Sequence, residues 1–256
     1  MPDTLSPPSM ILSIQSHVAY GYVGNKAAVF PLQCMGFDVC AVNTVQFSNH
    51  TGYQVWRGDI FSKDHIAEIL EGVKERGIFP DIKAVISGYL GEPDLGELVL
   101  ETVADIKAAS PDAVYICDPV MGDVGRGVFV KPDLPAFFEN RAVTRADVMT
   151  PNQFELGLLT GMKLDNINEI KTACAILHNK GIKTVLVTSL VTADIPEDEI
   201  GMLVSSDKGQ AYLIKTPKLP LNPEPNGSGD LTTALFAGNL LGCQSIKDAL
   251  AQTAHC

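Results

Sequence analysis

Six short apolar runs, separated by longer segments of mixed polarity, constrain the fold of this chain more than any other feature of its sequence. Each run is mostly continuously apolar, which is typical of strands that are buried on both faces. Such strands occur where helices cover both sides of a parallel sheet. The predicted strands cover residues 10–16, 37–47, 82–88, 113–118, 146–150 and 183–189.

The segments between these runs carry apolar residues at helical spacing. Repeated alternation of strand and helix predicts an α/β fold, a three-layer sandwich with a mostly parallel central sheet and helices on both faces. Residues 202–206 and 211–216, joined by a polar turn, predict an antiparallel hairpin at the sheet edge. Because no change of composition marks a boundary, we expect a flexible tail over 1–9 and a single domain over 10–256. The clearest helical faces are Leu95, Leu98, Val99, Thr102, Val103 and Ile106, and Ile167, Ile170, Cys174 and Leu177.

The acidic composition restricts the partners of the chain. The 256 residues include 30 Asp and Glu against 19 Lys and Arg, for a formal net charge of -11. A surface that follows nucleic-acid phosphates is therefore not expected. No apolar stretch approaches the ~18 residues of a membrane span. The six cysteines form no C-x-x-C pair, so we expect a cytoplasmic protein with reduced thiols and neither a nucleic-acid nor a membrane partner.

Polar residues follow each of the predicted strands. In an open α/β sheet the carboxyl ends of parallel strands meet at one edge, and ligands bind there. Any one of these polar positions is compatible with an ordinary turn, but together they predict a functional site. They are Ser16 and His17, residues 48–53, Gly88 and Tyr89, residues 117–123, residues 150–155, and Thr188 and Ser189.

The segment G-S-G-D at 227–230 precedes a run of helix-forming residues and allows two interpretations. In the first, Asp230 caps the helix by accepting hydrogen bonds from its first N–H groups. In the second, Gly227 and Gly229 let backbone N–H groups approach an anion at the helix N-terminus, and Asp230 has a chemical task beside that anion. A P-loop and a G-x-G-x-x-G motif are both missing, so another device would have to hold a nucleotide. The glycine-rich segment 122–127 predicts a mobile flap.

Five motifs carry a family resemblance. They are SIQSHVAYGYVGNKAAVFPLQ, VNTVQFSNHTGY, CDPVMGD, TPNQFE and GSGD, in this order. Together they resemble the motifs of pyridoxal kinases, in the ribokinase-like superfamily, over residues 12–254. The first two motifs are specific to pyridoxal kinases, whereas the others are shared with related small-molecule kinases. The resemblance implies a ribokinase-like fold and an enzyme that uses ATP to phosphorylate the 5′-hydroxymethyl group of pyridoxal, pyridoxine or pyridoxamine in vitamin B6 salvage.

The resemblance also implies roles on the substrate side. The matching positions for contacts to the pyridine ring are Ser16, Thr51 and Tyr89. Asp230 matches the general base that receives the proton of the attacking hydroxyl group, next to the substrate. The turn that holds the γ-phosphate and stabilises the reaction matches Gly227, Ser228 and Gly229.

On the ATP side, the resemblance implies a divalent cation, Mg²⁺ or another, and a monovalent cation, K⁺ or Na⁺. Asp123 matches an acidic residue near the triphosphate and Mg²⁺, and the N-x-x-E pair Asn152 and Glu155 matches residues that order water around the magnesium. Glu155 is also compatible with a simple contact at a helix start. The implied cation ligands are Asp118, Thr150, Thr188 and Glu155, and the implied ATP contacts are Asp123, Asn152, Glu155, Thr188, Ser189, Gly227 and Gly229.

Two alternatives stay open at this point. A hydroxymethylpyrimidine kinase would keep D-P-V and G-x-G-D but lack S-N-H-T-G-Y, and a pyridoxal-phosphate-binding protein without activity would keep the fold. The resemblance further implies a homodimer. A helical pattern opened by Ser245 runs to the last residues, whereas family members usually continue for another helix, so we expect a shortened C-terminal helix as one alternative.

Overall fold

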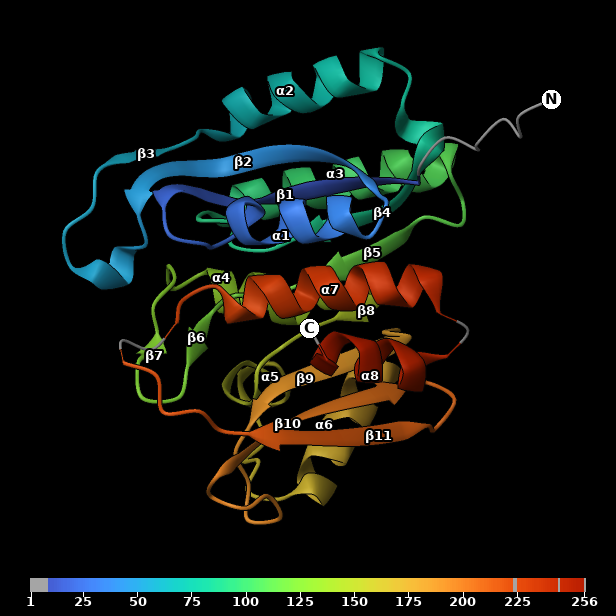
Figure 1. Ribbon diagram of the computed structural model, residues 1–256. Coiled ribbons are helices and arrows are strands. Elements are labelled where there is room, and N and C mark those ends of the chain that lie inside the picture. Colours follow the sequence, from blue (N-terminus) through green and yellow to red (C-terminus); the bar gives the residue numbers. More distant parts are fainter. Residues whose placement is uncertain (1–8, 223–224, 244, 256) are drawn as a thin grey trace.

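A nine-stranded sheet forms the centre of the computed structural model, which describes residues 9–222, 225–243 and 245–255 (Figure 1). Its strand order is β11-β10-β9-β8-β5-β4-β1-β2-β3. The neighbours from β9 to β2 pair in parallel, and β3, β10 and β11 pair antiparallel. The strands are β1 Met10–Tyr20, β2 Asp38–Asn49, β3 Gly58–Ile60, β4 Ile82–Ser87, β5 Val114–Cys117, β8 Val148–Met149, β9 Thr184–Leu190, β10 Glu199–Ser206 and β11 Ala211–Pro217, with a separate hairpin of β6 Gly122–Asp123 and β7 Gly127–Val128.

Helices cover both faces of this sheet. On one face, Ala28 and Leu32 of α1 and Phe236 of α7 pack with Ile86 of β4, and α8 joins the same cluster. Figure 1 shows α7 and α8 next to each other in front of the strands. The other face is covered by α2 to α6. The helices are α1 Asn25–Cys34, α2 Lys63–Glu75, α3 Pro93–Ala109, α4 Leu134–Asn140, α5 Gln153–Thr160, α6 Ile167–Asn179, α7 Ser228–Gly242 and α8 Ile246–His255, with short 3-10 turns η1 Thr51–Tyr53, η2 Phe79–Asp81 and η3 Ala142–Thr144.

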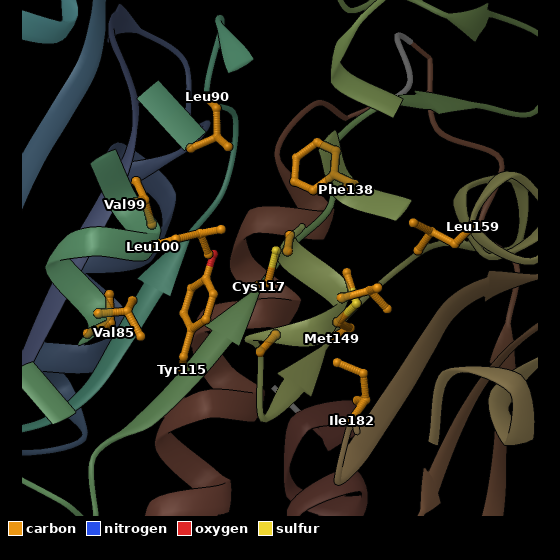
Figure 2. Close-up of a cluster of buried hydrophobic side chains, with 14 of the residues drawn as sticks. Val85, Leu90, Val99, Leu100, Tyr115, Cys117, Phe138, Met149, Leu159 and Ile182 are labelled. Atoms are coloured by element: carbon orange, nitrogen blue, oxygen red, sulfur yellow. The ribbon is translucent and has the colours of Figure 1, made fainter. Parts of the chain in front are cut away.

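The core on the second face explains why the strands are almost continuously apolar. Val85 of β4, Tyr115 of β5 and Met149 of β8 lie on neighbouring strands and are at most 2% exposed. Figure 2 shows them beside Val99 of α3 and Phe138 of α4. Alternate residues of the same strands face the cluster with α1 and α7, so both faces of each strand remove apolar surface from water.

The predicted α/β sandwich, its mostly parallel sheet and its edge hairpin are confirmed. Several boundaries were wrong. Strands β1 and β2 run on to Tyr20 and Asn49 because their polar ends continue to pair with each other. Strand β8 holds only two residues, and just before it the side chain of Asp147 accepts the Tyr115 amide. Strands β3, β6 and β7 were not predicted, because two or three residues are too few to show an alternation.

The two ends of the chain were the subject of separate predictions. The predicted tail over 1–9 lies outside the described residues except for Ser9. The helix predicted to begin at Ser245 is α8, and the Ser245 hydroxyl oxygen accepts a hydrogen bond from the Asp248 amide at 3.1 Å. No helix within the described part of the chain combines the length and the apolar character that a membrane crossing requires.

Candidate active site

The carboxyl edge of the parallel strands brings most of the predicted site residues together. The Asp118 amide donates to the Ser87 carbonyl at the end of β4, and the Thr150 amide donates to the Cys117 carbonyl at the end of β5. The Thr188 amide of β9 donates in turn to Pro151. These bonds, from 2.9 to 3.1 Å long, place the strand ends side by side in the order β4, β5, β8 and β9.

A chain of hydroxyl groups links this edge to helix α7. The Thr233 hydroxyl lies 2.8 Å from that of Thr150 and donates to Asp118 Oδ2 at 3.3 Å. All three side chains are at most 5% exposed. Thr233 was not among the predicted residues, although it follows Asp230 by three positions and therefore lies on the same side of the helix.

Three carboxylates at this edge hold their protons unusually strongly. Burial, and then the charges of Glu155 and Asp230, raise the pKa of Asp118 well above its usual range, while the bond from Thr233 opposes the rise. Burial raises the pKa of Glu155 to about 7 and that of Asp230 to about 6. Within the described residues, none of the three forms an ion pair with Lys, Arg or His. The ionised forms of these three carboxylates therefore have no basic side chain to stabilise them, and a bound cation would favour their ionisation.

Helix α7 begins with a turn that only glycine can form. Gly227 is its N-cap and has a φ of 84°, and a Cβ atom there would lie 1.8 Å from the Tyr22 carbonyl oxygen. Ser228 and Gly229 are exposed, and nothing lies within 4 Å of the place where Gly229 would carry a Cβ atom. The first N–H groups of the helix have no partner within it, and they lie at the positive end of the helix dipole.

Asp230 lies in the first turn of α7, and Gly227 instead occupies the capping position. The interpretation of Asp230 as the N-cap was therefore wrong. The side chain is half-buried, and the Gly24 amide partly offsets the rise in its pKa that burial causes. Gly24 was not among the predicted site residues. It has a φ of 54°, and a Cβ atom on it would lie 2.1 Å from the Ser16 carbonyl oxygen, so the loop before α1 fits between Ser16 and Asp230.

The three predicted ring-binding residues differ in burial. Ser16 is 9% exposed and lies within β1, as the predicted strand 10–16 placed it, and β1 continues beyond it to Tyr20. Tyr89 follows β4 and packs partly buried against a small apolar cluster of Val18, Val23, Val45 and Phe47. Thr51 is exposed in η1. A Cβ atom added to the next residue, Gly52, would lie 3.7 Å from Asn226 Oδ1. The η1 turn thus lies against the segment that leads into Gly227.

The side chains of His17, His50 and Glu155 make hydrogen bonds to other groups of the protein. His17 Nδ1 lies 3.0 Å from Gln46 Oε1, and His50 Nδ1 accepts from the Gly52 amide at 3.1 Å. Glu155 and Asn152 form a reciprocal capping box at the start of α5, so the capping contact considered for Glu155 is present.

Three of the residues predicted to contact ATP, Asp123, Thr188 and Ser189, lie on the β6–β7 hairpin and on β9. Asp123 is exposed in the β6–β7 hairpin, and its Oδ1 accepts from the Val124 amide at 2.7 Å. Thr188 is buried in β9, whereas Ser189 is exposed and has a φ of 55°. Within the described ranges, no three His, Cys, Asp or Glu side chains are grouped so that they could hold a metal ion. A cation at this edge would therefore need hydroxyl, water or phosphate oxygens as well.

A hollow of about 990 Å³ lies beside this edge, along α1. Its walls include Tyr22 and Phe30, which are 72% and 70% exposed, and it reaches Gly227 and Ser228. None of the predicted ring-binding residues lines it, so its position does not correspond to the predicted substrate site.

Known proteins share this arrangement. The family described as phosphomethylpyrimidine kinase matches residues 29–255. Pyridoxal kinase PdxY from Deinococcus radiodurans is 49% identical over 254 residues, which cover 97% of this chain and 85% of the relative. Pyridoxal kinase PdxY from Rubrobacter xylanophilus is 51% identical over 245 residues, which cover 95% of this chain and 83% of the relative.

The fold agrees with a solved structure in the same way. Pyridoxal kinase from Leishmania donovani in complex with ADP and pyridoxamine superposes with a TM-score of 0.89 at 36% identity, over 96% of this chain and 86% of that chain. Sequence identity of this extent, on the same fold, goes beyond a shared architecture. The chain belongs to the pyridoxal kinase family, within the ribokinase-like kinases.

Proposed function

We propose that Asp230 is the general base of this kinase. It would receive the proton of the 5′-hydroxymethyl group while that oxygen attacks the γ-phosphate of ATP. The observation that carries the proposal is its position in the first turn of α7, half-buried, without an ion pair within the described residues, and with its pKa raised to about 6. A base with a pKa near the working pH is mostly ionised at neutral pH and still accepts a proton effectively.

The turn before Asp230 supplies the second requirement of phosphoryl transfer, stabilisation of charge on the phosphate oxygens. Gly227, Ser228 and Gly229 present the free N–H groups of α7 to open space. Phosphoryl transfer depends mainly on in-line positioning and on electrostatic stabilisation, because the protein itself makes no covalent bond. We therefore assign these three residues as the anion hole.

The uncompensated carboxylates support binding of cations. Asp118, Thr150 and Thr188 offer the oxygen ligands that a monovalent cation, K⁺ or Na⁺, requires. Asp123, with Glu155 acting through its charge and through ordered water, fits Mg²⁺ or another divalent cation, which retains water ligands. Bound cations would supply positive charge beside the ATP phosphates. Asn152 and Ser189 lie next to these residues and complete the proposed ATP side.

The ring side of the substrate is proposed to rest on Ser16, Thr51 and Tyr89. Hydroxyl groups can donate to or accept from the ring substituents, and an aromatic side chain covers a flat ring. Relatives solved with pyridoxamine and with pyridoxine support an enzyme that accepts more than one vitamer. We therefore propose pyridoxal, pyridoxine and pyridoxamine as substrates.

A hydroxymethylpyrimidine kinase remains the second candidate, because the matching family is described as phosphomethylpyrimidine kinase. A coupled assay of ADP release distinguishes them, with ATP and Mg²⁺ and with pyridoxal, pyridoxine, pyridoxamine, hydroxymethylpyrimidine or ribose. We expect the highest kcat/KM with a B6 vitamer. A higher kcat/KM with hydroxymethylpyrimidine would reject the proposed substrate, and no ADP release with any of them would contradict the proposed reaction.

The cation proposal has its own test. K⁺ should lower the KM for ATP, because it places positive charge beside the phosphates of an acidic protein. Equal activity in K⁺ and in tetramethylammonium, at matched ionic strength, would contradict a monovalent-cation site at Asp118.

We also propose that the enzyme is a cytoplasmic homodimer. The exposed rings of Tyr22 and Phe30 beside the α1 hollow offer apolar surface that a second copy would cover. Free thiols at Cys117 and Cys174, whose pKa burial raises to about 12, suit a reducing compartment. Light scattering should give the mass of a dimer, and Phe30→Glu should give a monomer. A wild-type monomer at micromolar concentration would contradict the dimer.

A further inference from the structure

The first turn of α5, residues 152–155, makes more hydrogen bonds than a helix cap requires. Asn152 accepts from the Glu155 amide, and Glu155 Oε2 accepts from the Asn152 amide, both at 2.9 Å. In addition, Glu155 Oε1 accepts from the Met121 amide at 2.9 Å and from the Gly122 amide at 3.4 Å, and Asn152 Nδ2 donates to the Gly122 carbonyl at 2.8 Å. These extra bonds connect α5 to the start of the β6–β7 hairpin.

The same turn makes a second set of contacts on its other side. Gln153 Oε1 accepts from the Val191 amide, and Gln153 Nε2 donates to the Leu164 carbonyl, both at 2.8 Å. The Pro151 carbonyl, one residue before the turn, accepts from the Thr188 amide at 3.0 Å. Helix α5 contacts both the hairpin and β9, next to which it lies in Figure 1.

Both connected segments need external support. Each strand of the β6–β7 hairpin has two residues, and so short a hairpin is not stable by itself in water. At the end of β9, Ser189 has a φ of 55°, a conformation that is costly for a residue other than glycine and that persists only when its surroundings hold it. The bonds from α5 are directed at these two segments.

We infer that the first turn of α5 is a two-sided clamp that positions the hairpin carrying Asp123 and the β9 end carrying Thr188 and Ser189. Glu155 and Asn152 hold the hairpin, and Gln153 holds the end of β9. The clamp follows from these contacts alone. Its role in ATP binding rests on the proposed function, which assigns both segments to ATP. In this arrangement Glu155 is a positioning residue, since it is 4% exposed and its two oxygens already accept from three amides.

The chain offers a matched control for this clamp. Helix α6 also begins with an N-x-x-E sequence, Asn166 to Glu169. Asn166 accepts from the Glu169 amide at 3.0 Å, and Glu169 Oε2 accepts from the Asp165 amide at 2.6 Å. None of these bonds reaches the hairpin or the end of β9. Glu155→Gln and Glu169→Gln therefore make the same chemical change at two helix starts, of which only one is proposed to be a clamp.

Limited proteolysis and hydrogen exchange test the clamp without any need for activity. Arg126 is exposed at the tip of the hairpin, so trypsin cleavage after it reports opening of this segment. Glu155→Gln should raise the rate of this cleavage at least about fivefold, as expected for the loss of one hydrogen bond, and Glu169→Gln should leave it unchanged. Gln153→Ala should speed amide exchange over residues 188–195 and leave cleavage after Arg126 unchanged.

Two results would overturn the clamp. Wild-type cleavage after Arg126 in Glu155→Gln would show that Glu155 does not hold the hairpin, and equal effects of Gln153→Ala on both segments would show general destabilisation. If Glu155→Gln does not fold, Asn152→Ser keeps a capping oxygen, removes the bond to Gly122 and should raise the same cleavage. In an active enzyme, Gln153→Ala and Glu155→Gln should raise the KM for ATP more than that for pyridoxal. An unaltered KM for ATP, despite opened segments, would reject the link to ATP and leave Asp230 as the base untouched.

Discussion

At the amino edge of the sheet, just before β8, Asp147 accepts hydrogen bonds from Lys107, Lys183 and the Tyr115 amide, at 2.5 to 2.9 Å. At the carboxyl edge, just after β5, Asp118 accepts one hydroxyl hydrogen bond at 3.3 Å and has no ion pair within the described chain. Burial by itself raises the pKa of both carboxylates. At Asp147 the hydrogen bonds outweigh it and lower the pKa, whereas at Asp118 burial and neighbouring charges raise the pKa.

The comparison separates two uses of a carboxylate in one sheet. At the amino edge, Asp147 connects α3, β5 and β9 and contributes to stability. At the carboxyl edge, charge without a partner reduces stability and favours binding of cations from solution. Both pKa values are perturbed, but in opposite directions: the ion-paired Asp147 is more acidic than usual, and Asp118, which has no basic partner, is less acidic.

The largest effect is expected for a substitution of Asp230, at the carboxyl edge, and it tests the contrast between the two edges most directly. Asp230→Asn keeps the size of the side chain but cannot take up a proton, so we expect kcat to fall ~10²–10⁴-fold while pyridoxal binding and thermal stability stay near wild type. The measurement is steady-state ADP release with saturating ATP, Mg²⁺ and pyridoxal, together with the melting temperature. A variant that keeps more than about a tenth of wild-type kcat would reject Asp230 as the base.

Asp147→Asn is the matched change at the amino edge, with the opposite expectation. It should lower the free energy of unfolding by about 1–3 kcal/mol, because two lysines lose a charged partner, and leave kcat unchanged. The lowered pKa means that Asp147 contributes its stability above its unfolded pKa of about 3.9 and loses it as pH falls through the folded pKa. Urea unfolding at pH 7 and at pH 3 should therefore show a smaller difference at pH 3 than at pH 7. Equal stability at pH 7 would remove the contrast between the edges.

Thr51→Val compares a neutral hydroxyl group with the carboxylate of Asp230, because it removes the hydroxyl and changes no charge. If Thr51 binds a ring substituent, the KM for pyridoxal should rise about fivefold, the effect of losing one hydrogen bond, while the KM for ATP stays constant. Steady-state kinetics with each substrate varied gives both values. An unchanged KM for pyridoxal would place the ring away from η1.

The smallest expected effect concerns pH and cations. Asp118, Glu155 and Asp230 have folded pKa values above their unfolded ones, so the folded state binds more protons and loses stability as pH rises from about 4 toward 7 and above. Mg²⁺ and K⁺ should offset this loss and raise the melting temperature at pH 8 by about 2–4 °C more than at pH 5. Tetramethylammonium chloride at equal ionic strength is the control. An equal shift at both pH values would mean that the cations act elsewhere.

The sequence predicted the sheet and most strand ends, because buried strands need continuous apolar runs and the carboxyl edge needs polar residues. It could not predict Thr233, whose hydroxyl meets Asp118 only after α7 packs across β5 and β8. Asn152 to Glu155 and Asn166 to Glu169 follow the same local pattern, and only their three-dimensional neighbours distinguish them. Local spacing determines which helix starts are capped, whereas tertiary packing determines which of them reach a second segment.

The close approach of Gly227 to the Tyr22 carbonyl also has a consequence for synthesis of the protein. The strand ends that carry Ser16 and Tyr89 come early in the sequence, and Asp230 comes late. A ribosome must therefore release almost the whole chain before the loop of Tyr22 can contact the turn of Gly227. Until then, the early strands form a sheet whose ligand-binding edge lacks α7. Nascent chains should thus gain resistance to protease from ATP and pyridoxal only late in elongation, after the segment of Gly227 has been released.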